Sequence, residues 1–242
     1  MNVNYVPIDS EVLGRSVLSI DGFDPNEDFA AFELAYVERH QPAYVSCKIP
    51  LENVAAAHAL ERQGFHLIEC QIRSEIDLRR DYDMSAFPYE FVKVETEEEL
   101  APVLEIAATT FEHDRFSIDP LIERNVSGER YKRYVRRSFE AADEAVYRLY
   151  APADDRTVAF KTHRYLPGDQ VLLLLGGVHP SYKQLGVGVI NTYGELNELR
   201  RLGIRSGHTH ISAANYPVFN LEIRRLGFRV VTTFAVLRKI YR

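Results

Sequence analysis

Residues 170–200, QVLLLLGGVHPSYKQLGVGVINTYGELNELR, form the stretch from which the organisation of the whole chain follows. They begin with an uninterrupted apolar run, residues 171–175, which stops at two glycines. A run of this length with so sharp an end is typical of a strand that is buried on both faces. Helical periodicity resumes at Ile190 and continues to Leu199. The predicted order is a central strand, a glycine-containing loop and a helix.

The loop between the strand and the helix has the properties of an anion-binding site. Gly186 and Gly188 carry no side chain where the backbone enters the helix, so the free amides of the first turn can approach a negative group closely. The helix dipole adds partial positive charge there, which suits a pyrophosphate. Two glycines before a helix are also ordinary turn chemistry. The loop lacks the Gly-Lys-Ser/Thr ending of nucleotide triphosphatases and the third glycine of dinucleotide folds.

The segment 178–188, VHPSYKQLGVG, resembles the acyl-CoA loop of the Gcn5-related N-acetyltransferases (GNAT), where Gln/Arg-x-x-Gly-x-Gly/Ala follows a strand ending in Val-x-Pro. Lys183 stands where that family has Gln or Arg. A second family element follows: Asn215 in a turn after a strand, then a helix and the pair Gly227-Phe228. The resemblance implies an α/β GNAT fold, with a mostly antiparallel central sheet flanked by helices, and acetyl-CoA as co-substrate.

The resemblance also implies which residues contact acetyl-CoA. They lie at the end of the central strand, in the loop, in the first helical turn and on the Asn-bearing helix: Gly177, Val178, Lys183, Gln184, Leu185, Gly186, Val187, Gly188, Val189, Asn215 and Asn220. In the family, a backbone amide near Val178 donates to the thioester oxygen, which gains negative charge in the transition state.

The acid that protonates the departing thiolate is commonly a tyrosine on the Asn-bearing helix of the family, and the chain departs from the family here. Counting seven residues forward from Asn215 gives Glu222, and counting four back from Gly227 gives Ile223. Glu222 and Tyr216 are therefore the candidate catalytic residues in this segment, with packing at the helix entry as the alternative for Tyr216. A thiol has a pKa near 8.5, so water is a further candidate acid.

Histidines supply the candidates for a catalytic base and for metal ligands. His179, at the end of the central strand, is the first candidate for the base, because imidazole titrates near neutral pH; a polar loop histidine is the alternative. His163, on the neighbouring predicted strand, could face the substrate cleft. His208 and His210 alternate along a strand and share one face, but no third ligand is spaced with them. We therefore expect no metal site.

Composition and charge limit the class of protein. The chain has 242 residues, 46% of them hydrophobic and 11% aromatic, enough for a sizeable core. A net charge of −6 disfavours general nucleic-acid binding. No apolar run approaches 18 residues and the amino terminus has no basic start or apolar core, so we expect a cytoplasmic protein without a membrane partner. Cys47 and Cys70 are expected to be reduced core residues.

The series of elements that ends the chain also occurs near its start. Residues 43–78 read as strand, helix, Gly64-Phe65 and strand, with Asn53 eleven residues before Gly64, whereas Asn215 lies twelve residues before Gly227. We interpret residues 1–84 as a shortened GNAT-like domain and residues 85–242 as the complete one, with a linker at 79–84. The first copy has no Gly-x-Gly loop, so we expect it to extend the sheet and enclose the acceptor pocket.

The segment 114–120, DRFSIDP, is similar to one in the dTDP-fucosamine N-acetyltransferases, which acetylate the 4-amino group of a nucleotide-linked deoxysugar. This resemblance implies a nucleotide-linked aminosugar as the leading acceptor. Arg115 could contact a substrate phosphate, with an internal salt bridge to a neighbouring aspartate as the alternative. A helical stripe that begins at Arg130 is either a solvated face or a phosphate receptor. The candidate substrate-binding residues are Arg115, Phe116, Asp119 and His163.

Other functions stay open at this point. The acceptor could be a peptide or protein amine, or the acyl group could come from a carrier protein instead of CoA. The missing tyrosine also makes a CoA-binding module without catalysis an alternative from another class. Neither the acyl length nor the oligomeric state follows from the sequence, and a homodimer stays open.

Overall fold

The computed structural model describes residues 1–112, 114–123, 126–183 and 185–241. Within these residues the strands are β1 (Asn2–Tyr5), β2 (Val17–Asp21), β3 (Tyr44–Pro50), β4 (His66–Asp77), β5 (Glu90–Lys93), β6 (Glu144–Ala151), β7 (Arg156–Leu166), β8 (Gln170–Val178), β9 (Ser206–Ser212) and β10 (Arg229–Ile240). The helices are α1 (Pro7–Leu13), α2 (Phe29–His40), α3 (Val54–Arg62), α4 (Glu97–Thr110), α5 (Arg115–Ile118), α6 (Val126–Glu140), α7 (Val187–Arg201) and α8 (Tyr216–Asn220). Single turns of 3-10 helix span Pro152–Asp154 and Pro180–Tyr182, and a π-helix, η3, spans Leu221–Leu226.

These strands form one sheet in the order β1-β2-β3-β10-β4-β9-β8-β7-β6-β5. The pairs β2–β3 and β8–β9 are parallel, and the other neighbouring pairs are antiparallel. A helix crosses over between the two strands of each parallel pair, as a parallel connection requires. The prediction of a mostly antiparallel sheet flanked by helices is confirmed.

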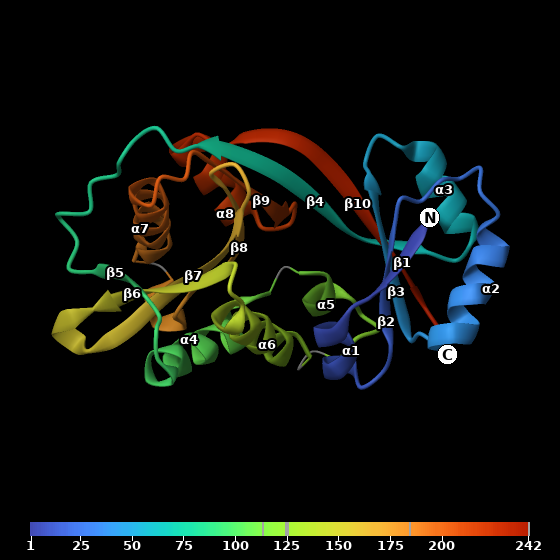
Figure 1. Cartoon of the computed structure of the whole chain (residues 1–242), viewed down its shortest axis with the longest axis horizontal. Coiled ribbons are helices and arrows are strands. Elements are labelled where there is room, and N and C mark those ends of the chain that lie inside the picture. The colour runs from blue at the N-terminus through green and yellow to red at the C-terminus, as the bar shows by residue number, and fades with distance from the viewer. Residues whose placement is uncertain (113, 124–125, 184, 242) are drawn as a thin grey trace.

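The sheet contains the same unit twice. One unit runs β2-α2-β3-α3-β4 and the other β8-α7-β9-α8-η3-β10. The last strand of each unit pairs inside the other unit, because β4 lies between β9 and β10 while β10 lies between β3 and β4. Figure 1 shows these two long strands side by side across the middle of the molecule. Since β10 completes the sheet of the first unit, the division of the chain at residues 84 and 85 stays a prediction.

The local signals of the repeat have the same structural roles in both copies. Asn53 caps α3 and Asn215 caps α8, each through its side-chain oxygen and a backbone amide three residues further on. Gly64 and Gly227 have φ angles of 81° and 86°, in the left-handed region that favours glycine. The second copy has one residue more between these signals, and the wider turn of the π-helix Leu221–Leu226 accommodates it.

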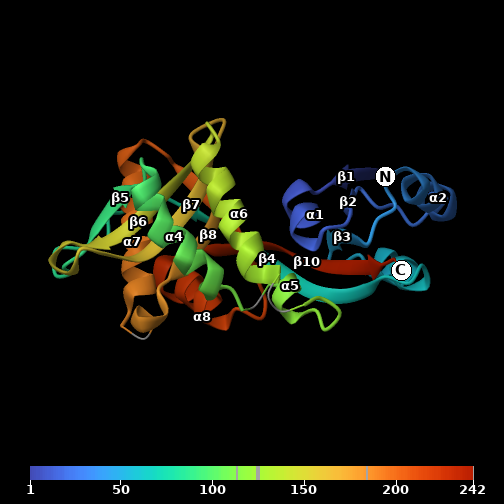
Figure 2. The ribbon, with the colours of Figure 1, turned by 90° about the horizontal axis from the view of Figure 1, so that it is seen from below.

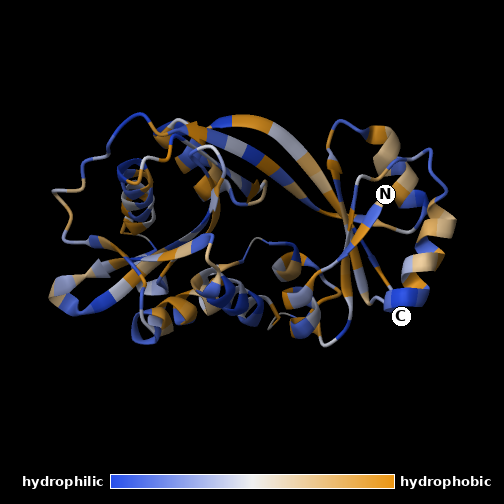
Figure 3. Ribbon diagram, viewed as in Figure 1, coloured by the Kyte–Doolittle hydropathy of each residue, from blue (hydrophilic) through white to orange (hydrophobic). Residues whose placement is uncertain are grey.

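Helices cover both faces of the sheet around β7 and β8, as Figures 1 and 2 show. On one face, Phe160 of β7 packs in a core with Leu100 of α4 and Val135 of α6. On the other face, Leu173 of β8 packs with Leu196 of α7. Hydropathy alternates along β4 in Figure 3, as expected for a strand whose two faces have different surroundings.

Buried ion pairs join the N-terminal unit to the α5–α6 region. The carboxylate of Asp9, on α1, is 1% exposed and accepts hydrogen bonds from Arg130 Nε at 2.7 Å and from the Tyr134 hydroxyl at 3.0 Å. Arg130 is therefore buried and paired, not part of a solvated face. Asp119 binds Arg238 of β10 through two hydrogen bonds of 2.7 and 3.0 Å. These pairs fix α6 against α1 and the end of α5 against β10.

The predicted linker is held against the second unit. The ring of Tyr82 stacks on Tyr193 of α7 with centroids 4.6 Å apart, and Arg200 contacts Asp81 at 2.7 Å. Among the described residues, no helix is long and apolar enough to cross a membrane. Cys47 is buried in the N-terminal core and its burial raises its pKa to about 12, whereas Cys70 is half-buried.

Candidate active site

The parallel strands β8 and β9 separate partway along their length. Their pairing starts at Gln170 and ends where Leu173 lies opposite Thr209. Residues 174–178 of β8 continue beside β7 alone, so one edge of this segment faces no strand of the described residues. The sheet therefore opens next to the loop that the sequence singles out.

The backbone geometry shows which groups point toward this open edge. The amide of His179 donates to the carbonyl of Val158 at 2.8 Å, so these two residues form a hydrogen-bonded antiparallel pair. Hydrogen-bonding direction alternates along a strand, and Val178 and Gly176 therefore direct their N–H and C=O groups away from β7. An extended ligand with amide groups can pair with such an edge as an added strand.

The two glycines before Val178 have different functions. A Cβ on Gly177 would lie 2.5 Å from the ring of Phe160, so this glycine is required for packing, and its own amide faces β7. A Cβ on Gly176 would lie 2.9 Å from Cδ of Lys161, whose side chain lies over it. Gly177 is among the residues predicted from the sequence, whereas Gly176, which faces the open edge, is not. A contact between Gly177 and acetyl-CoA stays a prediction.

The N-terminus of α7 fits an anionic group. Gly186 has a φ of 74° and occupies the N-cap position, where no side chain of the described residues caps the helix. A Cβ on Gly188 would meet only Val178, at an ordinary 3.7 Å, so internal packing does not require this glycine. The first turn thus presents uncapped amides and the positive end of a 15-residue helix. Val187 is buried beneath it and serves as an anchor in the core.

The remaining residues assigned to acetyl-CoA lie at several depths. Lys183 Nζ pairs with Glu112 Oε1 at 2.9 Å, which ties the loop to the end of α4. Leu185 is 65% exposed, Val189 is half-buried and Asn220 is exposed at the end of α8. Gln184 lies outside the described residues. The contacts of these residues with CoA stay predictions.

Glu222 is buried beside the open edge, on the face of the sheet that α7 covers. It is 8% exposed and accepts a hydrogen bond of 2.8 Å from the Ser74 hydroxyl of β4. Burial raises the pKa of Glu222 to about 7; the Lys161 ammonium acts in the opposite direction and the Glu195 carboxylate in the same direction. A carboxyl group with this pKa can give or take a proton at neutral pH.

A buried ion pair adjoins Glu222. Lys161 Nζ lies 3.0 Å from Glu195 Oε2, and the Glu195 side chain is 1% exposed. Burial alone would raise the pKa of Glu195, but Lys161 and His163 outweigh it and the pKa is lowered. Neither member of the pair is predicted from the sequence, although a lysine in an apolar strand and a glutamate on the apolar side of a helix are available signals.

Three of the sequence-predicted residues, His163, His179 and Tyr216, have different surroundings. His163 is fully buried, stacks on Tyr147 and places Nδ1 3.7 Å from Glu195. His179 Nδ1 accepts a hydrogen bond of 3.3 Å from the Ser181 amide, which occupies the lone pair that a base would use. Tyr216 is 68% exposed. Their roles in catalysis or substrate binding stay predictions.

The predicted substrate-binding residues of α5 already have partners within the chain. Arg115 lies 3.5 Å from Asp9, so its ion-pair partner is neither of the neighbouring aspartates that the sequence suggests. Phe116 is buried and stacks on Tyr44 with centroids 5.4 Å apart. Asp119 is bound to Arg238. A substrate role for these three residues stays a prediction.

His208 and His210 share one face of β9, as predicted, with ring centroids 6.2 Å apart. Burial, and next the nearby Lys48 ammonium, lower the pKa of His210 to about 4, so its imidazole is neutral at pH 7. Within residues 1–112, 114–123, 126–183 and 185–241, no three histidine, cysteine or acidic side chains are arranged to hold a metal ion.

Comparisons with known proteins identify the family. A family model described as an acetyltransferase (GNAT) domain matches residues 72–216, which is more than half of the chain. No curated protein shows significant sequence similarity to this chain. A GCN5-related N-acetyltransferase from Sphaerobacter thermophilus is similar in structure, with a TM-score of 0.70 and 12% identity over 98% of this chain and 76% of its own.

Two further solved structures share the fold. A GCN5-related N-acetyltransferase from Kribbella flavida has a TM-score of 0.63 and 17% identity, over 93% of this chain and 81% of its own. A tandem GNAT protein from the clavulanic acid biosynthesis pathway has a TM-score of 0.64 and 13% identity, over 93% of this chain and 75% of its own. At these identities, structural similarity shows the fold alone. Together with the matching family model, it shows that the chain belongs to the GNAT acetyltransferases, an N-acyltransferase family whose co-substrate is an acyl-CoA.

Proposed function

We propose that this acetyltransferase transfers the acetyl group of acetyl-CoA directly to a primary amine of a small molecule, with a nucleotide-linked aminosugar as the leading acceptor. The observation that carries the proposal is the open edge of β8 with the buried carboxyl of Glu222 beside it. An uncapped helix N-terminus for a pyrophosphate lies at the end of the same strand.

Acetyl-CoA fits the described residues and supplies the acetyl group as a reactive thioester. The first turn of α7 would hold its pyrophosphate, and the edge of β8 at Gly176 and Val178 would hold its amide-containing arm. The Val178 amide, which points away from β7, is the candidate donor to the thioester oxygen.

Glu222 is the candidate acid. Because its pKa is about 7, a large fraction of the carboxyl groups carries a proton at neutral pH. As the carbon–sulfur bond breaks and the carbon–nitrogen bond forms, the Glu222 carboxyl gives its proton to the thiolate sulfur. The ammonium of the acceptor must first lose one proton, to water or to a base. The nitrogen loses a second proton to water as the amide forms, and one proton from water then restores the Glu222 carboxyl. Ser74, which hydrogen-bonds one oxygen of Glu222, leaves the other oxygen for the proton.

The choice of acceptor rests on the resemblance of residues 114–120 to the aminosugar acetyltransferases. One protein region that shares the fold, with a TM-score of 0.67 and 10% identity, is described as a glucosamine N-acetyltransferase. Free glucosamine is therefore a useful second test compound beside nucleotide-linked aminosugars.

The experiment is thiol release from acetyl-CoA at neutral pH with a panel of nucleotide-linked aminosugars, glucosamine, amino acids, short peptides and polyamines. Turnover with an aminosugar nucleotide above all other amines is the expected result. Turnover with peptides alone would overturn the small-molecule acceptor. Tight acetyl-CoA binding without turnover on any amine, and without transfer from an acylated carrier protein, would identify a silent binding module instead.

A further inference from the structure

Four neighbouring strands carry polar and charged side chains on the face opposite to α7. Arg73 lies across from His210, and Glu75 across from His208, between β4 and β9. On the other side of β4, Lys48 of β3 extends over β10 and places its ammonium 4.3 Å from the centroid of the Phe234 ring. This face lies beside the open edge of β8, because β9 is the next strand.

The arginines near this face have carboxylate partners within the chain. Arg115 and Arg130 share the carboxylate of Asp9, and Arg73 pairs with Glu75 at 2.8 Å. Lys48 differs from them. Among the residues that the structure describes, no carboxylate lies within ion-pair distance of its ammonium, and its partner there is an aromatic ring.

Lys48 lies among other charged groups. Its side chain is exposed to solvent, yet burial by the surrounding protein lowers its pKa, and next the Arg115 guanidinium lowers it further. Lys48 also lowers the pKa of His210, so its positive charge acts across β10 and β4 toward β9. The Glu69 and Asp21 carboxylates act in the opposite direction, but among the described residues neither forms an ion pair with Lys48. A partly desolvated ammonium without an ion-pair partner attracts an anion.

The strand spacing sets the length of the molecule that Lys48 could bind. Its ammonium lies over β10, two strands from β9 and three from β8. Neighbouring strands are about 4.8 Å apart, so the distance from this ammonium to the open edge is about 10 to 15 Å. A free α-amino acid, whose amine and carboxylate share one carbon, is too short to reach both. A diphosphate between a sugar and a nucleoside lies far enough from the sugar amine.

We propose that Lys48 binds the anionic group of an elongated acceptor, a phosphate or a carboxylate about 10 to 15 Å from the amine that is acetylated. The inference rests on the proposed function, since the amine must reach the open edge of β8. It assigns substrate recognition to β3 of the N-terminal unit, while the neighbouring arginines hold α1, α5 and α6 in place.

Calorimetry with the full-length protein saturated with CoA tests the proposal, because CoA blocks nucleotide binding at its own site. The probes are uridine diphosphate for the phosphate and glutarate for the carboxylate. We expect at least one probe to bind and Lys48→Gln to weaken it about tenfold or more. Lys93→Gln, on the exposed face of β5 at the far end of the sheet, is the matched control and should bind as the wild type does.

The outcomes separate the two proposals. Equal probe affinity of Lys48→Gln and the wild type, or no binding of either probe to a wild type that binds acetyl-CoA, would overturn the role of Lys48 alone. Failure of the wild type to bind acetyl-CoA would overturn the proposed function. Once an acceptor is known, Lys48→Gln should raise its KM and leave kcat nearly unchanged, whereas a merely structural defect would also lower the affinity for acetyl-CoA.

Discussion

The two β-loop-α units of this chain, β2-α2 and β8-α7, have the same topology, but only one of them is open. In the first, β2 pairs with β3 from Val17 to Ile20, which is all but its last residue. In the second, pairing stops at Leu173, and residues 174–178 extend beyond it. A strand pair that stays closed has no edge for a ligand to join, so the topology alone does not create a CoA site.

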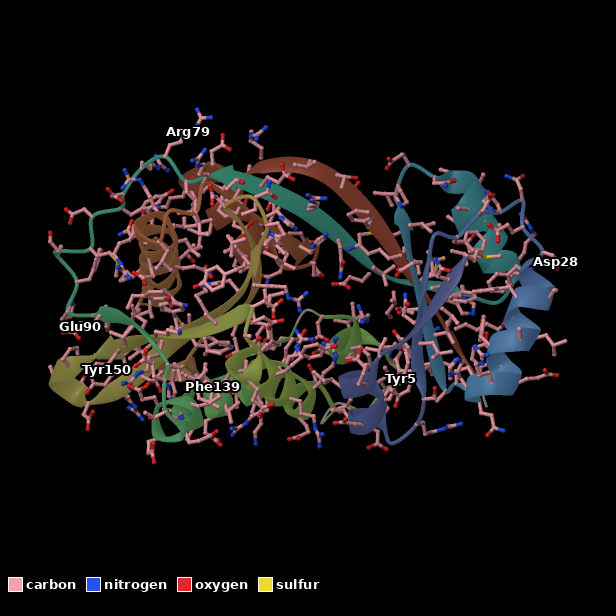
Figure 4. The ribbon with its side chains drawn as sticks, in the orientation of Figure 1. Tyr5, Asp28, Arg79, Glu90, Phe139 and Tyr150 are labelled. Atoms are coloured by element: carbon pink, nitrogen blue, oxygen red, sulfur yellow. The ribbon has the colours of Figure 1, made fainter. Side chains whose placement is uncertain are left out.

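The helix that follows shows the second difference. Asp28 caps α2 by accepting a hydrogen bond of 3.1 Å from the Ala31 amide. In Figure 4 it lies at the beginning of α2, at the outer end of the N-terminal unit. Gly186 leaves the N-terminus of α7 without a side-chain cap among the described residues. A carboxylate on the first turn satisfies the free amides and repels phosphate, whereas glycine leaves them for a ligand.

The largest effect is expected for Gly186→Asp, which gives the second unit the cap of the first. The new carboxylate would occupy the pyrophosphate position, so the affinity for acetyl-CoA should fall at least about a hundredfold, or about 2.8 kcal/mol. Calorimetric titration with acetyl-CoA measures this effect directly.

Gly203→Asp is the matched control for that variant. Gly203 follows α7 with a φ of 84°, and at both Gly203 and Gly186 a Cβ would meet no atom of the described residues within 4 Å beyond its chain neighbours. Both substitutions therefore carry similar left-handed strain, of about 1 kcal/mol. Acetyl-CoA affinity should be retained in Gly203→Asp. An equal loss in both variants would show that strain, and not the anion site, is responsible.

An intermediate effect is expected for Glu222→Gln, which removes the proton donor from the open unit. We expect kcat to fall about ten- to a hundredfold at pH 7, less than for many general acids because a thiolate is a good leaving group. The pKa of Glu222 is about 7, so the wild-type kcat should decline above pH 7 as the donor loses its proton, and the variant should lack this decline. A pH–rate profile at saturating acetyl-CoA checks both. An unchanged profile would assign the acid role to water.

The smallest effect is expected for Asp28→Ala, which removes the cap of the closed unit. Loss of an N-cap hydrogen bond should lower the free energy of unfolding by about 1 kcal/mol, measured by urea denaturation. The affinity for acetyl-CoA should not change, because the closed strands β2 and β3 still exclude a ligand. A second equivalent of bound acetyl-CoA in this variant would show that the cap alone keeps the first unit inactive.

Much of the fold could be predicted because its signals are local. The apolar run at residues 171–175, the asparagine caps and the glycines with positive φ each depend on a few consecutive residues. The sequence leaves two positions open for the family's tyrosine, Glu222 and Ile223, depending on the end of the helix from which residues are counted. The π-helix explains why: the extra residue within η3 makes counts from the two ends of the helix differ by one.

The partners of charged residues could not be predicted in the same way. Arg115 lies next to one aspartate in the sequence but pairs with Asp9, 106 residues away. Lys161 meets Glu195 only because β7 packs under α7. Ion pairs form between side chains that folding brings together, and their sequence separation carries no information on that distance.

The sequence by itself determined the class of protein: the glycine loop, the strand before it, the Asn-bearing helix and the repeated unit follow from periodicity and from the conformational preferences of glycine and asparagine. Only the tertiary structure decided which unit is open, which carboxyl has a pKa near neutrality, and which cation is left without a carboxylate partner among the described residues. These properties depend on strand pairing, burial and the sum of nearby charges, and such quantities exist only once distant segments are in contact.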